Sequence, residues 1–352
     1  MRTTTRLGVA TISASLALTA FAGSAAVAQD VEGSIDVHGS STVYPISTSV
    51  SEKFQEQNDG FGYTVGFEGT GDGFNQYFCP NVSDVSDASR PMKDAEAEIC
   101  AENGVTWTEL KVAYDGMAVM TSNDNPLECV NFYDLYAIFG GESDGINDYA
   151  AATAFAQELG STNDLGQGPI QNTAPGPESG TYDSFGEIVL EGIAEERGAE
   201  KAMRDPIPPA WTGAANDQVI IAGISQSPNP AAYTFVGLAY AEEAGDSVKV
   251  LAVDADGSGN CVLPSPETVS SGDYPISRPL FIYPGLDNLE SNPVIEPWVD
   301  FYLSDEGMAA VTETDYVMLP AEELEATRAQ WEAAKAGDES AVNARTWTES
   351  AE

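Results

Sequence analysis

The pattern of apolar and polar positions along the chain predicts alternating strands and helices. Val31 to His38 alternates apolar and polar residues, which is typical of a strand. After a turn at Gly39-Ser40-Ser41-Thr42, apolar residues recur at helical spacing from Val43 to Gln57. Tyr63 to Phe67 is predicted as a second strand, followed by a glycine-rich turn and a helix from about Phe74. These repeated strand–turn–helix units predict an α/β fold with a largely parallel sheet.

Two long apolar runs rich in β-forming residues divide the chain. They are Lys111 to Thr121 and Leu280 to Tyr283, and we predict that they are strands crossing between two lobes. The chain length supports two lobes, since a single hydrophobic core stops growing beyond about 250–300 residues. The predicted division is residues 29–114 plus 281–352 for lobe 1 and residues 120–278 for lobe 2, with hinge strands at about 111–121 and 279–284.

The N-terminal segment has the pattern of a secretory signal peptide. A basic start with Arg2 and Arg6 precedes a short apolar run and the small residues Ala26-Val27-Ala28. The run is short and rich in Ser and Thr, and no later segment offers about 18 uninterrupted apolar residues. We therefore expect residues 1–28 to be removed and the mature protein to be soluble in the periplasm.

The charge balance is strongly acidic, with 14 basic and 56 acidic residues and a formal net charge of −42. Nucleic acid and anionic membranes both bind through clustered Lys and Arg, so neither is an expected partner. Salty surroundings would screen such a surface and keep the protein soluble, and we expect a monomer. Most acidic residues are therefore interpreted as solvated surface.

Four cysteines follow the signal segment, at positions 79, 100, 129 and 261. An even number in an oxidising compartment suggests two disulfides, for which three pairings are possible. We favour a local bond, Cys79–Cys100, and a long-range bond, Cys129–Cys261. A metal site is the rival interpretation, but the chain has no C-x-x-C motif and a single histidine, so no metal or other cofactor is expected.

Three turns share one design that suits an anion. Each places glycine and small hydroxyl residues where a helix is predicted to begin, and unpaired backbone N–H groups at a helix start attract negative charge. Each turn taken alone has an ordinary explanation, because Ser and Thr are common helix caps and Gly is common in turns. The turns are Gly39-Ser40-Ser41-Thr42, Gly69-Thr70-Gly71-Asp72-Gly73 and Ser179-Gly180-Thr181.

A fourth motif, Ser86-Asp87-Ala88-Ser89-Arg90-Pro91, adds both signs of charge. The guanidinium of Arg90 fits a tetrahedral oxyanion, although a surface ion pair is the simpler explanation in so acidic a chain. Asp87 would repel a bare anion, but it can accept a proton that the anion carries. Hydrogen phosphate carries one at neutral pH and sulfate does not, so this pocket would reject sulfate.

The runs GSSTVYP, EGTGDGF, SDASRPM, AYDGMAV and ESGTYDSF occur here in the order seen in PstS-type phosphate-binding proteins, which this chain resembles. The resemblance implies a two-lobed type II periplasmic binding fold with phosphate held in the cleft. It also implies that Asp87 is the proton-accepting residue and that Thr70 stands where the family usually has a contacting Ser. The other contacts carried over by position are Ser41, Thr42, the backbone of Val43, and Ser179, Gly180 and Thr181.

One departure concerns the positive charge of the site. Many family members place an Arg four residues before the Ser of the S-G-T turn, and this chain has Pro175 there. We infer that Arg90 supplies the charge instead.

The resemblance implies capture of inorganic phosphate and its delivery to the inner-membrane permease of an ABC importer. The alternatives are a binding protein for sulfate, molybdate or tungstate, and a secreted phosphatase. Asp87 argues against the first group. A phosphatase would need a metal cluster or an activated nucleophile, and neither is evident, since His38 is the single histidine of the chain. We therefore expect no enzymatic activity.

Overall fold

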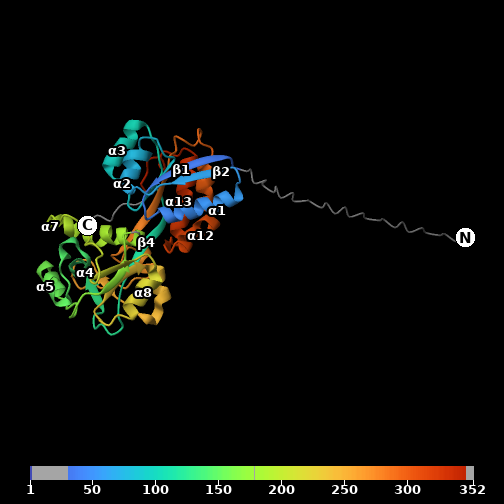
Figure 1. Cartoon of the computed structure of the whole chain (residues 1–352). Coiled ribbons are helices and arrows are strands. Elements are labelled where there is room, and N and C mark those ends of the chain that lie inside the picture. Colours follow the sequence, from blue (N-terminus) through green and yellow to red (C-terminus); the bar gives the residue numbers. More distant parts are fainter. Residues whose placement is uncertain (2–30, 178, 346–352) are drawn as a thin grey trace.

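The computed structural model describes Met1, residues 31–177 and residues 179–345, which form two lobes joined by extended strands (Figure 1). The predicted signal peptide lies outside the described residues. Within the described part of the chain, no helix is long and apolar enough to cross a membrane.

The first lobe is built on strands β1 (Gly33–Gly39), β2 (Phe61–Val65) and β3 (Val85–Ala88). Strand β1 lies in the middle and pairs in parallel with both β2 and β3. Strands β4 (Leu110–Thr121), β11 (Ser277–Pro284) and β12 (Val317–Met318) extend the sheet in the order β12-β4-β11-β3-β1-β2.

The prediction of a largely parallel sheet was wrong. Strand β11 pairs antiparallel with both β3 and β4, and β12 pairs antiparallel with β4. The repeated strand–turn–helix units do form the parallel part, but the two long strands that connect the lobes run in opposite directions through the same sheet. A mixed sheet results.

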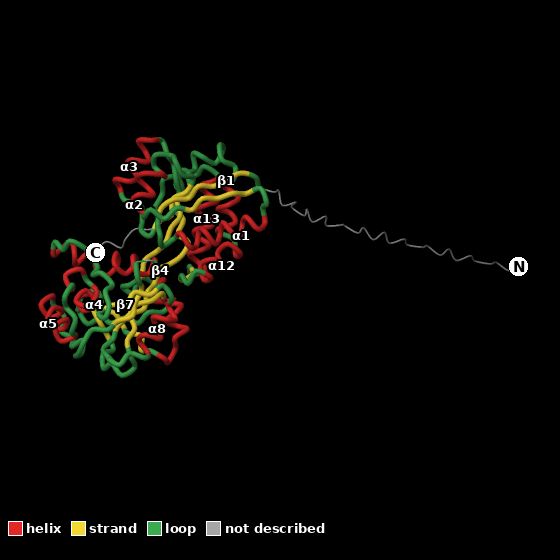
Figure 2. The backbone as a smooth tube through the Cα atoms, viewed as in Figure 1, coloured by secondary structure: helices red, strands yellow, loops and turns green. Residues whose placement is uncertain are grey.

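Helices cover both faces of this sheet (Figures 1 and 2). On one face, Ile46, Val50 and Phe54 recur at helical spacing on α1 and lie in a core with the buried Trp298. The opposite face packs Phe74, Phe78 and Trp107 against alternate residues of β11. The helices of the first face are α1 (Tyr44–Gln57), α11 (Ile295–Tyr302), α12 (Asp305–Glu313) and α13 (Ala321–Lys335), and those of the second are α2 (Thr70–Asp72), η1 (Gly73–Phe78) and α3 (Asp94–Asn103).

The second lobe has its own core, centred on the stacked rings of Phe185 and Phe235 and the edge of Phe139. Its strands are β5 (Cys129–Asn131), β6 (Asn172–Pro175), β7 (Trp211–Ala214), β8 (Tyr233–Gly237), β9 (Lys249–Val250) and β10 (Ala252–Asp254). Its helices are α4 (Phe132–Phe139), η2 (Gly141–Ser143), α5 (Tyr149–Leu159), α6 (Gly180–Phe185), η3 (Gly186–Leu190), α7 (Glu191–Arg197), α8 (Asp217–Ser225), α9 (Leu238–Ala244), η4 (Gly245–Ser247) and α10 (Pro266–Ser270).

Strand β4 belongs to both lobes. Its first half pairs with β11 and β12, and its second half pairs with β8 and β9. The predicted strands at 111–121 and 280–283 are therefore confirmed, and so are the first two predicted strands and the helix after the first turn. The exact limits of the predicted lobes stay a prediction.

Both predicted disulfides are confirmed. The bond between Cys79 and Cys100 ties the end of η1 to α3, with the two Cα atoms 4.2 Å apart. The bond between Cys129 and Cys261 joins β5 to the loop after β10, and its Cα atoms are 6.0 Å apart. The long-range bond links segments 132 residues apart in sequence within the second lobe.

Candidate functional site

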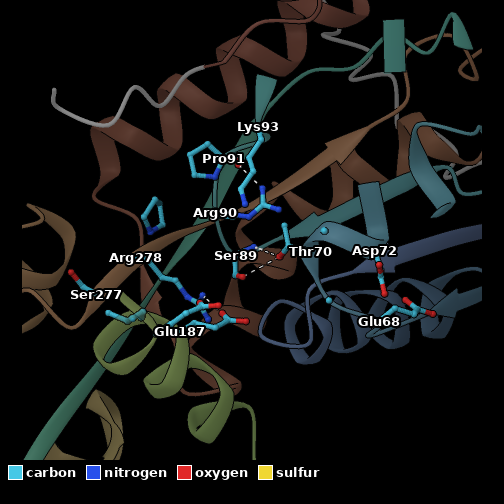
Figure 3. Close-up of a pocket in the computed structure, with 15 residues that line it drawn as sticks. Glu68, Thr70, Asp72, Ser89, Arg90, Pro91, Lys93, Glu187, Ser277 and Arg278 are labelled. Carbon is cyan, nitrogen blue, oxygen red and sulfur yellow. Dashed lines mark hydrogen bonds and ion pairs between the residues drawn. The ribbon is translucent and has the colours of Figure 1, made fainter. Parts of the chain in front are cut away.

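A cleft of about 680 Å³ separates the two lobes and brings together segments distant in sequence (Figure 3). The first lobe lines it with residues 68–72 and with Ser89, Arg90, Pro91 and Lys93. The second lobe contributes Glu187, Ile188 and Glu191, and strand β11 contributes Ser277, Arg278 and Pro279. An adjoining hollow reaches Ser41 on one side and Tyr182 and Asp183 on the other.

The first predicted turn is held tightly against strand β3. Gly39 has a φ of 143°, and a Cβ atom there would lie 2.1 Å from the carbonyl oxygen of Asp87, so only glycine fits. The hydroxyl of Ser40 accepts hydrogen bonds from the backbone N–H groups of Thr42, at 3.1 Å, and Val43, at 3.4 Å. The predicted backbone donor of Val43 therefore already has a partner within the turn.

The second predicted turn places two hydroxyls on the cleft wall. Gly69 adopts a φ of 102° and is followed by Thr70, whose Oγ1 accepts a hydrogen bond from the backbone N–H of Ser89 at 3.1 Å. The hydroxyls of Thr70 and Ser89 are also 3.1 Å apart. Figure 3 shows both side chains together at the wall. Asp72 accepts a hydrogen bond from Gln76 one helical turn later.

Asp87 is completely buried at the end of β3. Its Oδ1 accepts a hydrogen bond from Ser47 at 2.9 Å, and the Ser47 hydroxyl lies 3.3 Å from that of Tyr302. Its Oδ2 has no hydrogen-bond partner among the described residues. Burial raises the pKa of Asp87 to about 8, against the lowering effect of Ser47. With these protein partners alone, the carboxyl is therefore protonated at neutral pH and ionised above about pH 8.

The third predicted turn opens helix α6 in the second lobe. Ser179 is the residue before the helix and has an extended backbone, but its side chain does not cap the helix. Gly180 faces the first lobe, because a Cβ atom there would lie 4.0 Å from the carbonyl oxygen of Ser41. The predicted turns around Ser41 and Gly180 thus approach each other, and Thr181 follows within the helix.

Arg90 lines the cleft but is held by its own lobe. Its two terminal nitrogens donate to both carboxylate oxygens of Glu96, at 2.7 and 2.9 Å, and one also donates to the carbonyl of Pro91. The Glu96 side chain is only 6% exposed. The guanidinium of Arg90 is therefore already paired with Glu96. Its inferred role as the positive charge of the site stays a prediction.

Sequence reasoning missed a second arginine, Arg278 on strand β11. One of its terminal nitrogens donates to the hydroxyl of Thr42 at 3.0 Å and to that of Ser184 at 2.7 Å. The other donates to Glu187, and the Nε atom lies 3.4 Å from Asp115 of β4. This guanidinium therefore touches the first predicted turn, the helix after the third turn and the connecting strand.

Weak sequence signals for the missed residues exist. Arg278 is one of eight arginines in the chain and directly precedes the apolar run from Pro279 to Tyr283. Ser184 lies one helical turn after Gly180, so both share the helix face that looks into the cleft.

Comparisons with known proteins place this architecture in a class. The PBP superfamily domain matches residues 23–306. Protein SphX of Synechococcus elongatus is 34% identical over 304 residues, which cover 86% of this chain and 82% of that protein. The phosphate-binding protein PstS of Staphylococcus epidermidis is 30% identical over 293 residues, covering 83% and 81%. The chain belongs to the PBP superfamily and, within it, to the family of PstS-type phosphate-binding proteins.

Solved structures agree on the fold. A possible phosphate-binding protein from Planctomyces limnophilus superposes with a TM-score of 0.74 at 31% identity, covering 86% of this chain and 99% of that one. An ABC-type phosphate transport receptor from Vibrio cholerae superposes with a TM-score of 0.56 at 21% identity, over 81% and 99%. The predicted two-lobed type II periplasmic binding fold is confirmed.

Proposed function

We propose that this protein captures inorganic phosphate in the cleft between its lobes and delivers it to the inner-membrane permease of an ABC importer. Membership in the PstS-type family and the phosphate-binding relatives support this function. Proteins of this family bind substrates for transporters, and the proposal includes no catalytic step and no cofactor.

The observation that carries the proposal is Asp87 Oδ2, a buried oxygen without a partner among the described residues. A buried polar atom left unpaired costs about 1–3 kcal/mol. Above about pH 8 the carboxyl is ionised and needs a donor. Hydrogen phosphate supplies one through its protonated oxygen, whereas sulfate has only acceptors and would face a bare carboxylate.

The proposed contacts come from both lobes, so that the anion would hold the lobes together. Ligand that touches both lobes favours the closed state by its differential affinity. Strands 111–121 and 279–284 serve as the hinge in this proposal. The first lobe contributes Ser41, Thr42, Val43, Thr70, Asp87 and Arg90, and the second contributes Ser179, Gly180 and Thr181.

We also propose that the protein works in the periplasm as a monomer after removal of residues 1–28. Two disulfides within the described residues suit an oxidising compartment. The net charge of −42 disfavours binding to nucleic acid, which is itself negatively charged.

Calorimetric titration of the mature protein with phosphate, arsenate and sulfate at about pH 8.5 tests the function. We expect tight phosphate binding with one site per chain and no heat from sulfate. Small-angle scattering should show compaction when phosphate is added. Equal affinity for sulfate and phosphate would refute the proton-sharing account and favour a general oxyanion-binding protein.

A further inference from the structure

Arg278 lies where the lobes meet, in a chain that has Pro175 where many family members have an arginine. Its guanidinium contacts the hydroxyl of Thr42 on the first lobe and that of Ser184 on the second. Only 13% of the Arg278 side chain is exposed. By contrast, Arg90 already forms a bidentate ion pair with the buried carboxylate of Glu96. Arg278 is thus the arginine of the cleft that contacts both lobes.

The two carboxylates beside Arg278 differ in burial and therefore in role. Asp115 has a side chain only 7% exposed and lies against Nε at 3.4 Å. Burial raises the pKa of Asp115, and the neighbouring Arg278 opposes this rise. Glu187 instead has a side chain 54% exposed and contacts a terminal nitrogen. Asp115 holds the guanidinium through its Nε atom. Glu187 can turn into solvent at small cost, because exposed ion pairs contribute about 0–1 kcal/mol.

The hydroxyl of Thr42 connects this cluster to the proposed anion position. Arginine has only donors, so Thr42 Oγ1 accepts the bond from Arg278, and its own proton can go either to Ser184 Oγ, 3.2 Å away, or to an anion. An anion that accepts this proton lies within reach of the same guanidinium. The anion and Glu187 would then compete for one cation. Figure 3 shows Glu187 beside the guanidinium of Arg278.

We propose that Arg278 is the guanidinium that binds the anion, and that the carboxylate of Glu187 occupies it until the anion displaces this carboxylate. The inference rests on the proposed function and adds Arg278 to the positive charge that Arg90 is proposed to supply there. Glu187 sets the affinity through this competition, because each phosphate bound must release one carboxylate from Arg278. It also ties release to opening, since Glu187 and Thr42 belong to different lobes.

The test is a titration of the mature protein with inorganic phosphate at low salt, comparing Glu187→Gln with Glu191→Gln. Both changes remove one negative charge from residues lining the same cleft, but no contact between Glu191 and Arg278 is found among the described residues. Glu187→Gln should bind phosphate about three- to tenfold tighter, because the competitor is gone. Glu191→Gln should stay within about twofold of the wild type.

A double-mutant cycle with Arg278→Gln tests whether Glu187 acts through Arg278. Arg278→Gln should weaken phosphate binding by more than about tenfold, and adding Glu187→Gln to it should then have no further effect. Equal tightening by the Glu187 and Glu191 variants, or a Glu187 effect that persists without Arg278, would overturn the inference. If Arg278→Gln fails to fold, as thermal unfolding would reveal, the exposed Glu187 and Glu191 variants still decide. A wild type that does not bind phosphate would instead refute the proposed function itself and the inference with it.

Discussion

Two charged groups of the proposed site, Asp87 and Arg278, are built in opposite ways. Asp87 is placed entirely by the first lobe, through the end of β3 and a hydrogen bond from Ser47 on α1. Arg278 is placed by contacts from both lobes and from the connecting strand. The first group has its contacts within one lobe, whereas the second has contacts on both lobes.

This difference separates selection of the anion from closure of the lobes. In the proposed function, Asp87 responds to whether the anion carries a proton, because its Oδ2 lacks a partner among the described residues and its pKa is raised to about 8. Arg278 responds to any oxyanion that competes with Glu187. We therefore expect substitutions at Asp87 to change which anion binds and substitutions around Arg278 to change how tightly all anions bind.

The largest expected effect is that of Asp87→Asn. The variant keeps the shape of the side chain but can present an N–H donor to the anion. At about pH 8.5, losing a charge-assisted hydrogen bond should weaken phosphate binding by about ten- to a hundredfold, while sulfate binding becomes measurable. Calorimetry with both anions measures this exchange of specificity.

The pH dependence provides the control for this variant. In the wild type, sulfate can bind only while Asp87 is protonated, so sulfate affinity should fall as pH rises through about 8. Asparagine does not titrate, so the fall should vanish in the variant. Unchanged sulfate exclusion in Asp87→Asn would mean that Asp87 does not select the anion.

Local sequence patterns were sufficient to single out Asp87. The motif from Ser86 to Pro91 contains the last three residues of β3, and Asp87 was proposed as an anion contact from its neighbours in sequence. The same holds for the elements around the first two turns. The cysteine pairing also followed from an even count and from the preference for one local bond.

The contacts of Arg278 could not be predicted in this way. Arg278 meets Thr42 across 236 residues of sequence and Ser184 across 94, and no local pattern carries such contacts. Arg90 was favoured because it adjoins Asp87 in the motif, but its pairing with Glu96 depends on how α3 packs. The mixed sheet was missed for a similar reason, since strand direction in β4 and β11 follows from the path between the lobes.

A smaller effect concerns thermal stability. At high pH, substitution of Asp87 should raise the Tm, whereas substitution of Arg278 should lower it. Asp87 has a pKa of about 8 when folded against an ordinary value of 3.8. Between these values the folded protein binds more protons than the unfolded chain, so this group lowers the free energy of unfolding as pH rises, and the loss is complete above about pH 8. Asp87→Asn should therefore raise the Tm at about pH 8.5 by a few degrees and by less at about pH 5.

Arg278→Gln should do the reverse, because it leaves the buried carboxylate of Asp115 without its cation. Its Tm should fall further below that of the wild type as pH rises, since Asp115 then ionises without compensation. Thermal unfolding by circular dichroism at the two pH values measures both shifts. A lower Tm for both variants at the higher pH would mean that Asp87 is stabilised by a donor not evident in the fold.

The smallest effects are expected from two serines that hydrogen-bond to these groups, Ser47 to Asp87 and Ser184 to Arg278. Ser47→Ala removes the hydrogen bond that lowers the pKa of Asp87, so the pH at which sulfate binding is lost should move upward. Ser184→Ala removes an acceptor of Arg278 and should weaken phosphate and sulfate alike by about two- to fivefold, with that pH unchanged. Titrations with both anions from about pH 6 to about pH 10 separate the two behaviours, because only a group coupled to Asp87 can move the midpoint. A shifted midpoint in Ser184→Ala would show that the two charged groups act as one unit, and selection and closure would then be a single property of the cleft.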